Sequence, residues 1–255
     1  MSATQSLHIS INAEPLFELA GIPITNSIVV TWVVSALLIL FAFSVSRVLK
    51  LGGKLSRLQL ISEMMIEGLH NLVLGIAGTA KARLFFPLVA TFFLFIIVSN
   101  WSGILPGAGT IGINRMLHGK ETFVPFLRAP TADINTTLAL SLISMVLVQV
   151  WGFSHLGFSY LKKFFNFSNP INFFVGILEL ISDLSKVISF TFRLFGNIFA
   201  GEVLLAVIAY LLPVLAPVPF VGLEIFVGFI QALVFGMLSL VFFNMATLAH
   251  SEEAH

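Results

Sequence analysis

Six ionisable side chains lie inside the last two apolar stretches of the chain, residues 170–212 and 220–248. A charged group at membrane depth costs about 2.5 to 3.5 kcal/mol on insertion scales, so each of them needs a reason. Four are carboxylates, which can bind and release protons, and one is an arginine, which effectively stays charged. The six residues are Glu179, Asp183, Lys186, Arg193, Glu202 and Glu224.

Helical geometry gathers most of these residues into one polar stripe. At about 100° per residue, five polar side chains fall within about 80° of one another, whereas Glu202 points about 140° away from them. The proline-rich turn at residues 213–219 makes the next helix antiparallel. Gln231, which shares a face with Glu224, can therefore lie near the depth of Arg193. The stripe consists of Glu179, Asp183, Lys186, Arg193 and Asn197.

The depths of the four acids divide them into two groups around the arginine. Glu202 lies about 13 Å from Arg193 along the helix axis, and Glu224 lies on the same side of it. Glu179 and Asp183 lie about 15 to 21 Å away in the opposite direction. A proton passing between carboxylates would be blocked at Arg193 unless another group carried it past. The pattern predicts two half-channels with a barrier, and a partner that brings its own ionisable group.

The composition requires that these groups belong to a membrane protein. Of the 255 residues, 58% are hydrophobic and only 10% are charged, against about 25% charged in a typical soluble domain. This excludes a soluble enzyme and a disordered chain, and the net charge of +1 excludes a nucleic-acid binder. No cysteine is present, and His70, His118 and His155 lack ligand-like spacing. We therefore expect neither a metal site nor another cofactor.

Five apolar stretches are long enough to cross about 30 Å of hydrocarbon as helices. We expect an all-α membrane protein that forms a single integral membrane domain over residues 1–255, with residues 1–26 outside the membrane. Residues 170–212 would be about 60 Å long as one helix and must then be strongly tilted or extend out of the bilayer; two helices are the alternative. Residues 170–249 form the predicted antiparallel hairpin. The five expected spans are 27–45, 84–105, 134–157, 170–212 and 220–248.

Residues 55–75 differ from the five spans because they separate polar from apolar residues. Polar side chains recur on one face at helical spacing, and apolar ones on the other. This pattern predicts an amphipathic helix that lies in the membrane interface rather than crossing it.

The basic residues predict the orientation of the chain in the membrane. With the N-terminus outside, eight basic residues lie on the inner side and three on the outer side, so the C-terminus is cytoplasmic. The first 26 residues contain no Lys or Arg, so we expect no cleaved secretory signal. The inner residues are Arg47, Lys50, Lys54, Arg57, Lys81, Arg83, Lys162 and Lys163, and the outer ones are Arg115, Lys120 and Arg128.

Four short motifs occur in order along the chain. They are SNW at 99–101, PTADINTT at 130–137, FRLFGNIFAGE at 192–202 and QALVF at 231–235. Together they strongly resemble subunit a of the bacterial-like rotary F-type ATP synthases, from about residue 60 to the C-terminus. The resemblance implies a non-catalytic stator subunit, not an enzyme, that couples H⁺ flow to rotation of a c-subunit ring and to ATP synthesis. The implied partners are the c-subunit ring, b-type peripheral stalk subunits and the rest of the ATP synthase, besides membrane lipid.

The resemblance also implies roles for individual residues. Arg193 matches the essential arginine that faces the c-ring carboxylate, with Asn197 and Gln231 as its polar neighbours. The outer half-channel matches Glu202 and Glu224, with Asn100, Asp133 and Asn135 along its outer approach. Glu179 and Ser189 match the inner path, to which helical geometry adds Asp183. The implied location is the bacterial plasma membrane, with an organelle energy-transducing membrane as the alternative.

Other interpretations of the same residues remain open. Glu179, Asp183 and Lys186 can form a solvated cluster at the cytoplasmic surface. Asn100, Asn135 and Gln231 can serve as hydrogen bonds between helices. A stand-alone transporter would carry internal repeats and a broken-helix site, and neither is evident. A purely structural scaffold is disfavoured by the energetic cost of the six ionisable groups.

Overall fold

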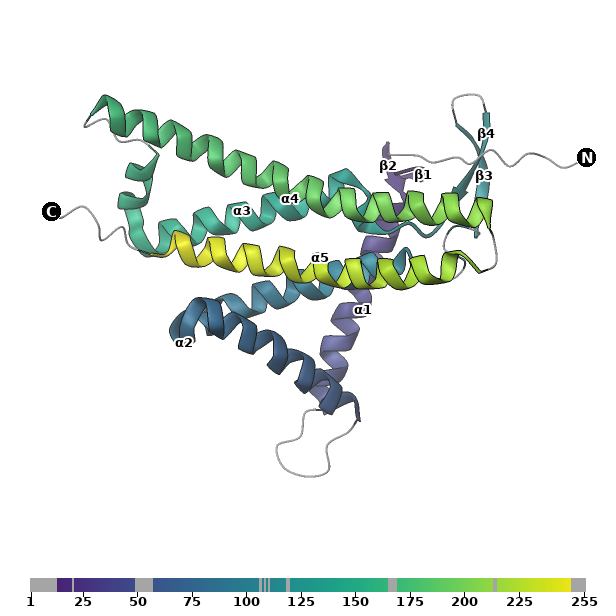
Figure 1. The fold of residues 1–255 in the computed structure, drawn as a ribbon, viewed down its shortest axis with the longest axis horizontal. Helices are drawn as coiled ribbons and strands as arrows, with labels where there is room; N and C mark the ends of the chain where they lie inside the picture. The colour runs from purple at the N-terminus through teal and green to yellow at the C-terminus, as the bar shows by residue number, and fades with distance from the viewer. Residues whose placement is uncertain are drawn as a thin grey trace, which may run out of the picture. The chain divides into compact units, whose positions relative to one another are not determined.

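The computed structural model describes residues 13–19, 21–48, 57–105, 107, 109, 111–117, 120–164, 169–212 and 215–248 of the chain. Nearly all of this part is helical (Figure 1). The long helices are α1 (Asn26–Val48), α2 (Arg57–Ser102), α3 (Ile134–Leu156), α4 (Pro170–Leu211) and α5 (Pro217–Ala246). Two short 3-10 helices, η1 (Pro130–Ala132) and η2 (Gly157–Lys163), flank α3.

Within the described ranges, five helices are long and apolar enough to cross a membrane. This confirms the predicted all-α membrane class and its five spans. α4 is one helix of 42 residues, so the alternative of two shorter helices is wrong. The tilt of α4 and α5 in the membrane stays a prediction.

α2 contains a sharp break at Gly78, where the backbone adopts φ 71° and ψ 170°. Figure 1 shows α2 bending there into two helical arms. The break separates the predicted amphipathic helix, which begins at Arg57 in the structure, from the predicted span at 84–105, which ends at Ser102. That the first arm lies in the membrane interface remains a prediction.

The chain divides into two compact units, each assembled from three stretches of sequence. Unit 1 combines the described residues of Met1–Ser44, Leu94–Thr137 and Phe192–Leu233. Unit 2 combines those of Val45–Phe93, Leu138–Thr191 and Val234–His255. That residues 1–255 form one integral membrane domain remains a prediction.

Unit 1 contains two small antiparallel hairpins that the sequence analysis did not predict. β1 (Pro15–Leu19) pairs with β2 (Ile22–Thr25), and β3 (Gly112–Leu117) pairs with β4 (Lys120–Pro125). The Arg115 Nη1 donates to the Pro15 carbonyl at 2.9 Å and so joins the two hairpins. At the start of α1, the Asn26 side chain donates to the Pro125 carbonyl at 3.1 Å. These bonds attach the first helix to the segment that leads into η1.

Unit 2 has an aromatic core. The rings of Phe85 and Trp151, and those of Phe85 and Phe243, lie 5.7 Å apart between centroids, so α2, α3 and α5 all contribute. Ser144 and Ser239 share a buried hydrogen bond of 2.8 Å between α3 and α5. A polar bond of this kind adds specificity to helix packing in an apolar setting.

The break in α2 predicts unequal effects of two glycine substitutions in that helix. Gly78→Ala should lower the free energy of unfolding by about 1 to 3 kcal/mol, because only glycine adopts this backbone conformation without strain. Among the described residues, no heavy atom of a neighbour lies within 4 Å of a Cβ built at Gly78 or at the helical Gly75, so steric clash does not distinguish them. Gly75→Ala should be neutral or stabilising by up to about 1 kcal/mol. Denaturation of the detergent-solubilised protein checks this; equal stability of the two variants would contradict it.

Candidate functional site

The predicted outer acids Glu202 and Glu224 come together in unit 1. A Cβ built at Gly201 would lie 2.7 Å from the Glu224 Oε1, so the carboxylate on α5 packs against the α4 backbone beside Glu202. Glu224 is only 7% exposed, and its Oε2 is buried with no hydrogen-bond partner among the described residues. Glycine at position 201 therefore makes room for an acid that would otherwise stand away from α4.

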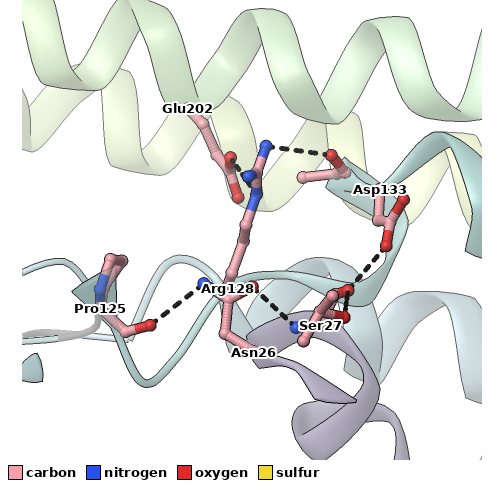
Figure 2. Close-up of polar contacts among 8 residues, drawn as sticks. Asn26, Ser27, Pro125, Arg128, Asp133 and Glu202 are labelled. Carbon is pink, nitrogen blue, oxygen red and sulfur yellow. Dashed lines mark hydrogen bonds and ion pairs between the residues drawn. The ribbon is translucent and has the colours of Figure 1, made fainter. Parts of the chain in front are cut away.

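A buried arginine joins this pair of acids. Arg128 reaches from the segment before η1 toward Glu202, with 3.9 Å between its Nε and the Glu202 Oε2 (Figure 2). Its Nη2 donates to the Ala132 carbonyl at 3.3 Å. In the sequence, Arg128 is predicted only to be a loop residue whose charge sets the orientation of the chain. Its position just before the motif at 130–137 was the one feature of the sequence that could have indicated a role at the site.

Asn100, expected along the outer approach, ties three elements together. Its Nδ2 donates to the Gly228 carbonyl on α5 at 2.8 Å, and its Oδ1 accepts from the Thr131 hydroxyl of η1 at 2.6 Å. The neighbouring Trp101 Nε1 donates to the Ile225 carbonyl at 3.1 Å. These bonds attach the end of α2 to α5 next to Glu224. Asn100 therefore does form a hydrogen bond between helices.

Asp133 caps the first turn of α3. Its Oδ1 accepts the backbone N–H of Asn135 at 3.0 Å, as an N-cap carboxylate does. Its Oδ2 accepts from the Ser27 hydroxyl at 2.7 Å, which ties α3 to the start of α1 (Figure 2). Asp133 is buried, whereas the side chain of Asn135 is exposed.

The arginine neighbours predicted on α4 and α5 also meet in unit 1. The Asn197 Nδ2 donates to the Gln231 Oε1 at 2.6 Å. Asn197 on α4 pairs with Gln231 on α5, and Gly201, which follows Asn197, contacts Glu224, which precedes Gln231. The two helices therefore run antiparallel here. Arg193 lies one turn before Asn197 on the exposed surface of α4. Arg193 is therefore accessible at the surface of the chain as the structure describes it.

The inner residues Glu179 and Asp183 lie in unit 2, each with a lysine. The Lys163 Nζ, at the end of η2, lies 2.7 Å from the Glu179 Oε1. The Lys186 Nζ lies 2.7 Å from the Asp183 Oδ1. The ion pairs support the interpretation of these residues as a charge cluster. Ser189, one turn further along α4, is exposed.

Asp183 also belongs to a hydrogen-bonded chain that reaches α3 and η2. Gln149 Nε2 donates to the Asp183 Oδ2 at 2.8 Å, and the Tyr160 hydroxyl donates to the Gln149 Oε1 at 2.9 Å. With these contacts Asp183 holds α4 to α3. Neither Gln149 nor Tyr160 stood out in the sequence, because single polar residues in an apolar run have no spacing pattern.

The structure thus assigns the predicted site residues to two groups. Unit 1 holds the arginine, its neighbours and the outer acids, and unit 2 holds the inner residues. The unit 1 residues are Asn100, Asp133, Asn135, Arg193, Asn197, Glu202, Glu224 and Gln231, and the unit 2 residues are Glu179, Asp183 and Ser189.

Comparisons with known proteins agree on one family. The model of the family described as "ATP synthase A chain" matches residues 28–244. "ATP synthase subunit a" of Trichlorobacter lovleyi is 35% identical over 233 residues, which is 90% of this chain and 89% of that protein. The protein of the same name from Geotalea uraniireducens is 36% identical over 235 residues, again 90% and 89%. That from Gloeobacter violaceus is 37% identical over 228 residues, 89% and 86%.

The close approach of Glu224 to α4 predicts a coupling between positions 201 and 224. Gly201→Ala should lower the free energy of unfolding by about 1 to 3 kcal/mol, because the new methyl group overpacks the carboxylate. Gly222→Ala, where no heavy atom of another described residue lies within 4 Å of the added Cβ, should be neutral or slightly stabilising.

Shortening the acid by Glu224→Asp should reduce the penalty of Gly201→Ala by about 0.5 to 3 kcal/mol in a double-mutant cycle. Thermal unfolding in detergent measures all four variants. Additive effects of the two substitutions would contradict the contact.

Proposed function

Because the chain belongs to the ATP synthase A chain family, we propose that it is the proton-translocating stator subunit of an ATP synthase. The chain is a multi-pass membrane protein, with five described helices that are long and apolar enough to span. The proposal includes two offset half-channels that lead protons to and from carboxylates of a c-subunit ring. It assigns no bond-making chemistry to this chain.

The observation that carries the proposal is the meeting of Glu202 and Glu224 on the two helices that also bear Arg193 and Gln231. Gly201 brings the Glu224 carboxylate against α4, and the bond from Asn197 to Gln231 fixes the same helix pair. Two proton-exchanging groups at one end and a permanent cation on the same helix suit an ion path with a barrier.

In the outer half-channel, protons would pass Asn100, Asp133 and Asn135 and reach Glu224 and Glu202. The hydrogen bonds of Asn100 and Asp133 give both side chains a second task, since they hold α5 and α1 in place around the acids. We place these two residues beside the path as its framework, and the two glutamates on it.

Arg193 would separate the two half-channels. Its exposed position on α4 lets a ring carboxylate approach, and an opposite charge at short range stabilises the ionised carboxylate. The ring group could then release its proton only toward one half-channel and receive one only from the other. Ring rotation, rather than a proton jump past Arg193, would connect them.

The inner half-channel would involve Glu179, Ser189 and Asp183. Lys163 and Lys186 each pair with one of the two acids at 2.7 Å, which supports a polar region on α4 that water could reach. Asp183 is tied to Gln149 as well, so its contribution is to hold the wall of this region.

The proposed setting is the bacterial plasma membrane, with the N-terminus outside and the C-terminus in the cytoplasm. The relatives reported above are bacterial, and the excess of basic residues on one side supports this orientation. The proposed partners are the c-subunit ring, the b-type peripheral stalk subunits and the other subunits of the synthase.

Removal of the arginine tests this function. Arg193→Ala in the complete complex, reconstituted into vesicles, should abolish ATP-driven proton pumping, because no permanent charge would then separate the half-channels. Arg83→Ala is a matched control: Arg83 is an exposed arginine of α2. It should pump as the unmodified complex does. Full pumping by Arg193→Ala, measured as quenching of a pH-sensitive dye, would contradict the proposal.

A cysteine substitution tests the inner half-channel separately. The chain contains no cysteine, so Ser189→Cys introduces a unique thiol. A membrane-impermeant maleimide added from the cytoplasmic side should label it at least about tenfold faster than Ile188→Cys, because the reactive thiolate forms only in contact with water.

Ile188 is a suitable control because it is 50% exposed but apolar and next in sequence. Mass spectrometry of the labelled subunit gives both rates. Equal labelling rates at positions 188 and 189 would contradict the assignment of Ser189 to the inner half-channel.

A further inference from the structure

Arg128 is a buried cation in contact with an acid that the proposed function places on the outer path. Its side chain is 9% exposed, whereas Arg193 lies on the exposed surface of α4. A buried arginine in a membrane protein is retained only where its charge is compensated. The compensating group here is Glu202, at 3.9 Å from the Arg128 Nε.

The backbone that carries Arg128 is fixed on several sides. The Arg128 Nη2 donates to the Ala132 carbonyl at 3.3 Å, and the three residues of η1 are all buried. Thr131 of η1 donates to Asn100 at 2.6 Å, so this segment is bound to the end of α2. Figure 2 shows the guanidinium extending from this segment to α4, with the Asn26 and Ser27 bonds below it. The cation therefore has a defined position relative to Glu202.

A glycine directly after the end of α2 permits this approach. A Cβ at Gly103 would lie 2.8 Å from the Ala129 Cβ and 3.5 Å from the Glu202 Oε1. The missing side chain lets Ala129, the residue after Arg128, pack against the backbone that follows α2, close to Glu202. The contact between Arg128 and Glu202 is thus supported by α2, α4 and the η1 segment together.

We propose that Arg128 is a positioning residue for proton transfer, and that its charge holds the Glu202 carboxylate at one place beside Glu224. This inference rests on the proposed function, which places Glu202 on the proton path. The attraction acts on the carboxylate and largely disappears when Glu202 carries a proton. Arg128 therefore returns the side chain to the same position after every transfer. The two arginines differ in burial, since Arg193 is exposed on α4 whereas Arg128 is buried beside Glu202.

The test compares substitutions of Arg128 in the complete complex reconstituted into vesicles. Arg128→Gln should reduce ATP-driven proton pumping at least about tenfold, because a small displacement of a transfer group has large kinetic effects. Arg128→Lys, which keeps the charge, should retain pumping within about threefold of the unmodified complex. Arg115→Gln is the control, because Arg115 is another arginine of unit 1. Its side chain donates to the Pro15 carbonyl. This variant should leave pumping unchanged.

Rates are normalised to the amount of this subunit in the purified complex, so that incomplete assembly is not counted as lost pumping. Rescue by lysine is the outcome that a purely packing role of Arg128 would not give. If Arg128→Lys is as inactive as Arg128→Gln, or if Arg128→Gln pumps normally, the inference is overturned.

Glu202→Gln and the double variant separate this inference from the proposed function. Glu202→Gln should slow pumping to a low but measurable rate, and Arg128→Gln combined with it should slow that rate no further, because the two residues act as one unit. A further loss in the double variant would show that Arg128 acts elsewhere and would overturn the inference. Normal pumping by Glu202→Gln would show that Glu202 does not lie on the proton path, and would overturn this role of Arg128. The barrier role of Arg193 is tested separately by Arg193→Ala.

Discussion

The cost of placing charge in a low-dielectric environment governs this structure. Three of the four acids within the last two apolar helices contact a cation: Glu202 with Arg128, Glu179 with Lys163 and Asp183 with Lys186. Such pairing offsets the desolvation that would otherwise exclude these groups. Glu224 differs, since one of its oxygens is buried without a hydrogen-bond partner in the part of the chain that the structure describes. This condition supports the role that we propose for Glu224, the exchange of a proton.

The scaffold around the acids uses polar contacts where lipid provides no hydrophobic driving force between helices. The bond from Asn197 to Gln231 and the space at Gly201 set the relation of α4 to α5. Asn100 and Trp101 attach the end of α2 to the α5 backbone. The acids of unit 1 therefore sit on helices whose approach is fixed by short side chains and backbone carbonyls. This fixed geometry is consistent with the proton path that we propose.

Much of this arrangement is predictable from the sequence. The five spans follow from the length of the apolar runs, and the meeting of Asn197 with Gln231 follows from 3.6-residue periodicity and one proline-rich turn. The partners that come from connecting segments are not predictable in this way. In the sequence, Arg128 and Lys163 indicate only the orientation of the chain in the membrane. The two hairpins form from short segments that mix polar and apolar residues. Asp133 caps α3. Each of these depends on tertiary contacts between distant segments, which no spacing rule encodes.

The central claim is that Arg193 faces a moving carboxylate of another subunit across the exposed surface of α4. A density map of the intact complex at side-chain resolution tests it most directly. We expect the guanidinium of Arg193 to lie within ion-pair distance of a neighbouring ring helix, next to its carboxylate. A map in which lipid or a stationary subunit covers this surface of α4, with the ring packed elsewhere, would contradict the account.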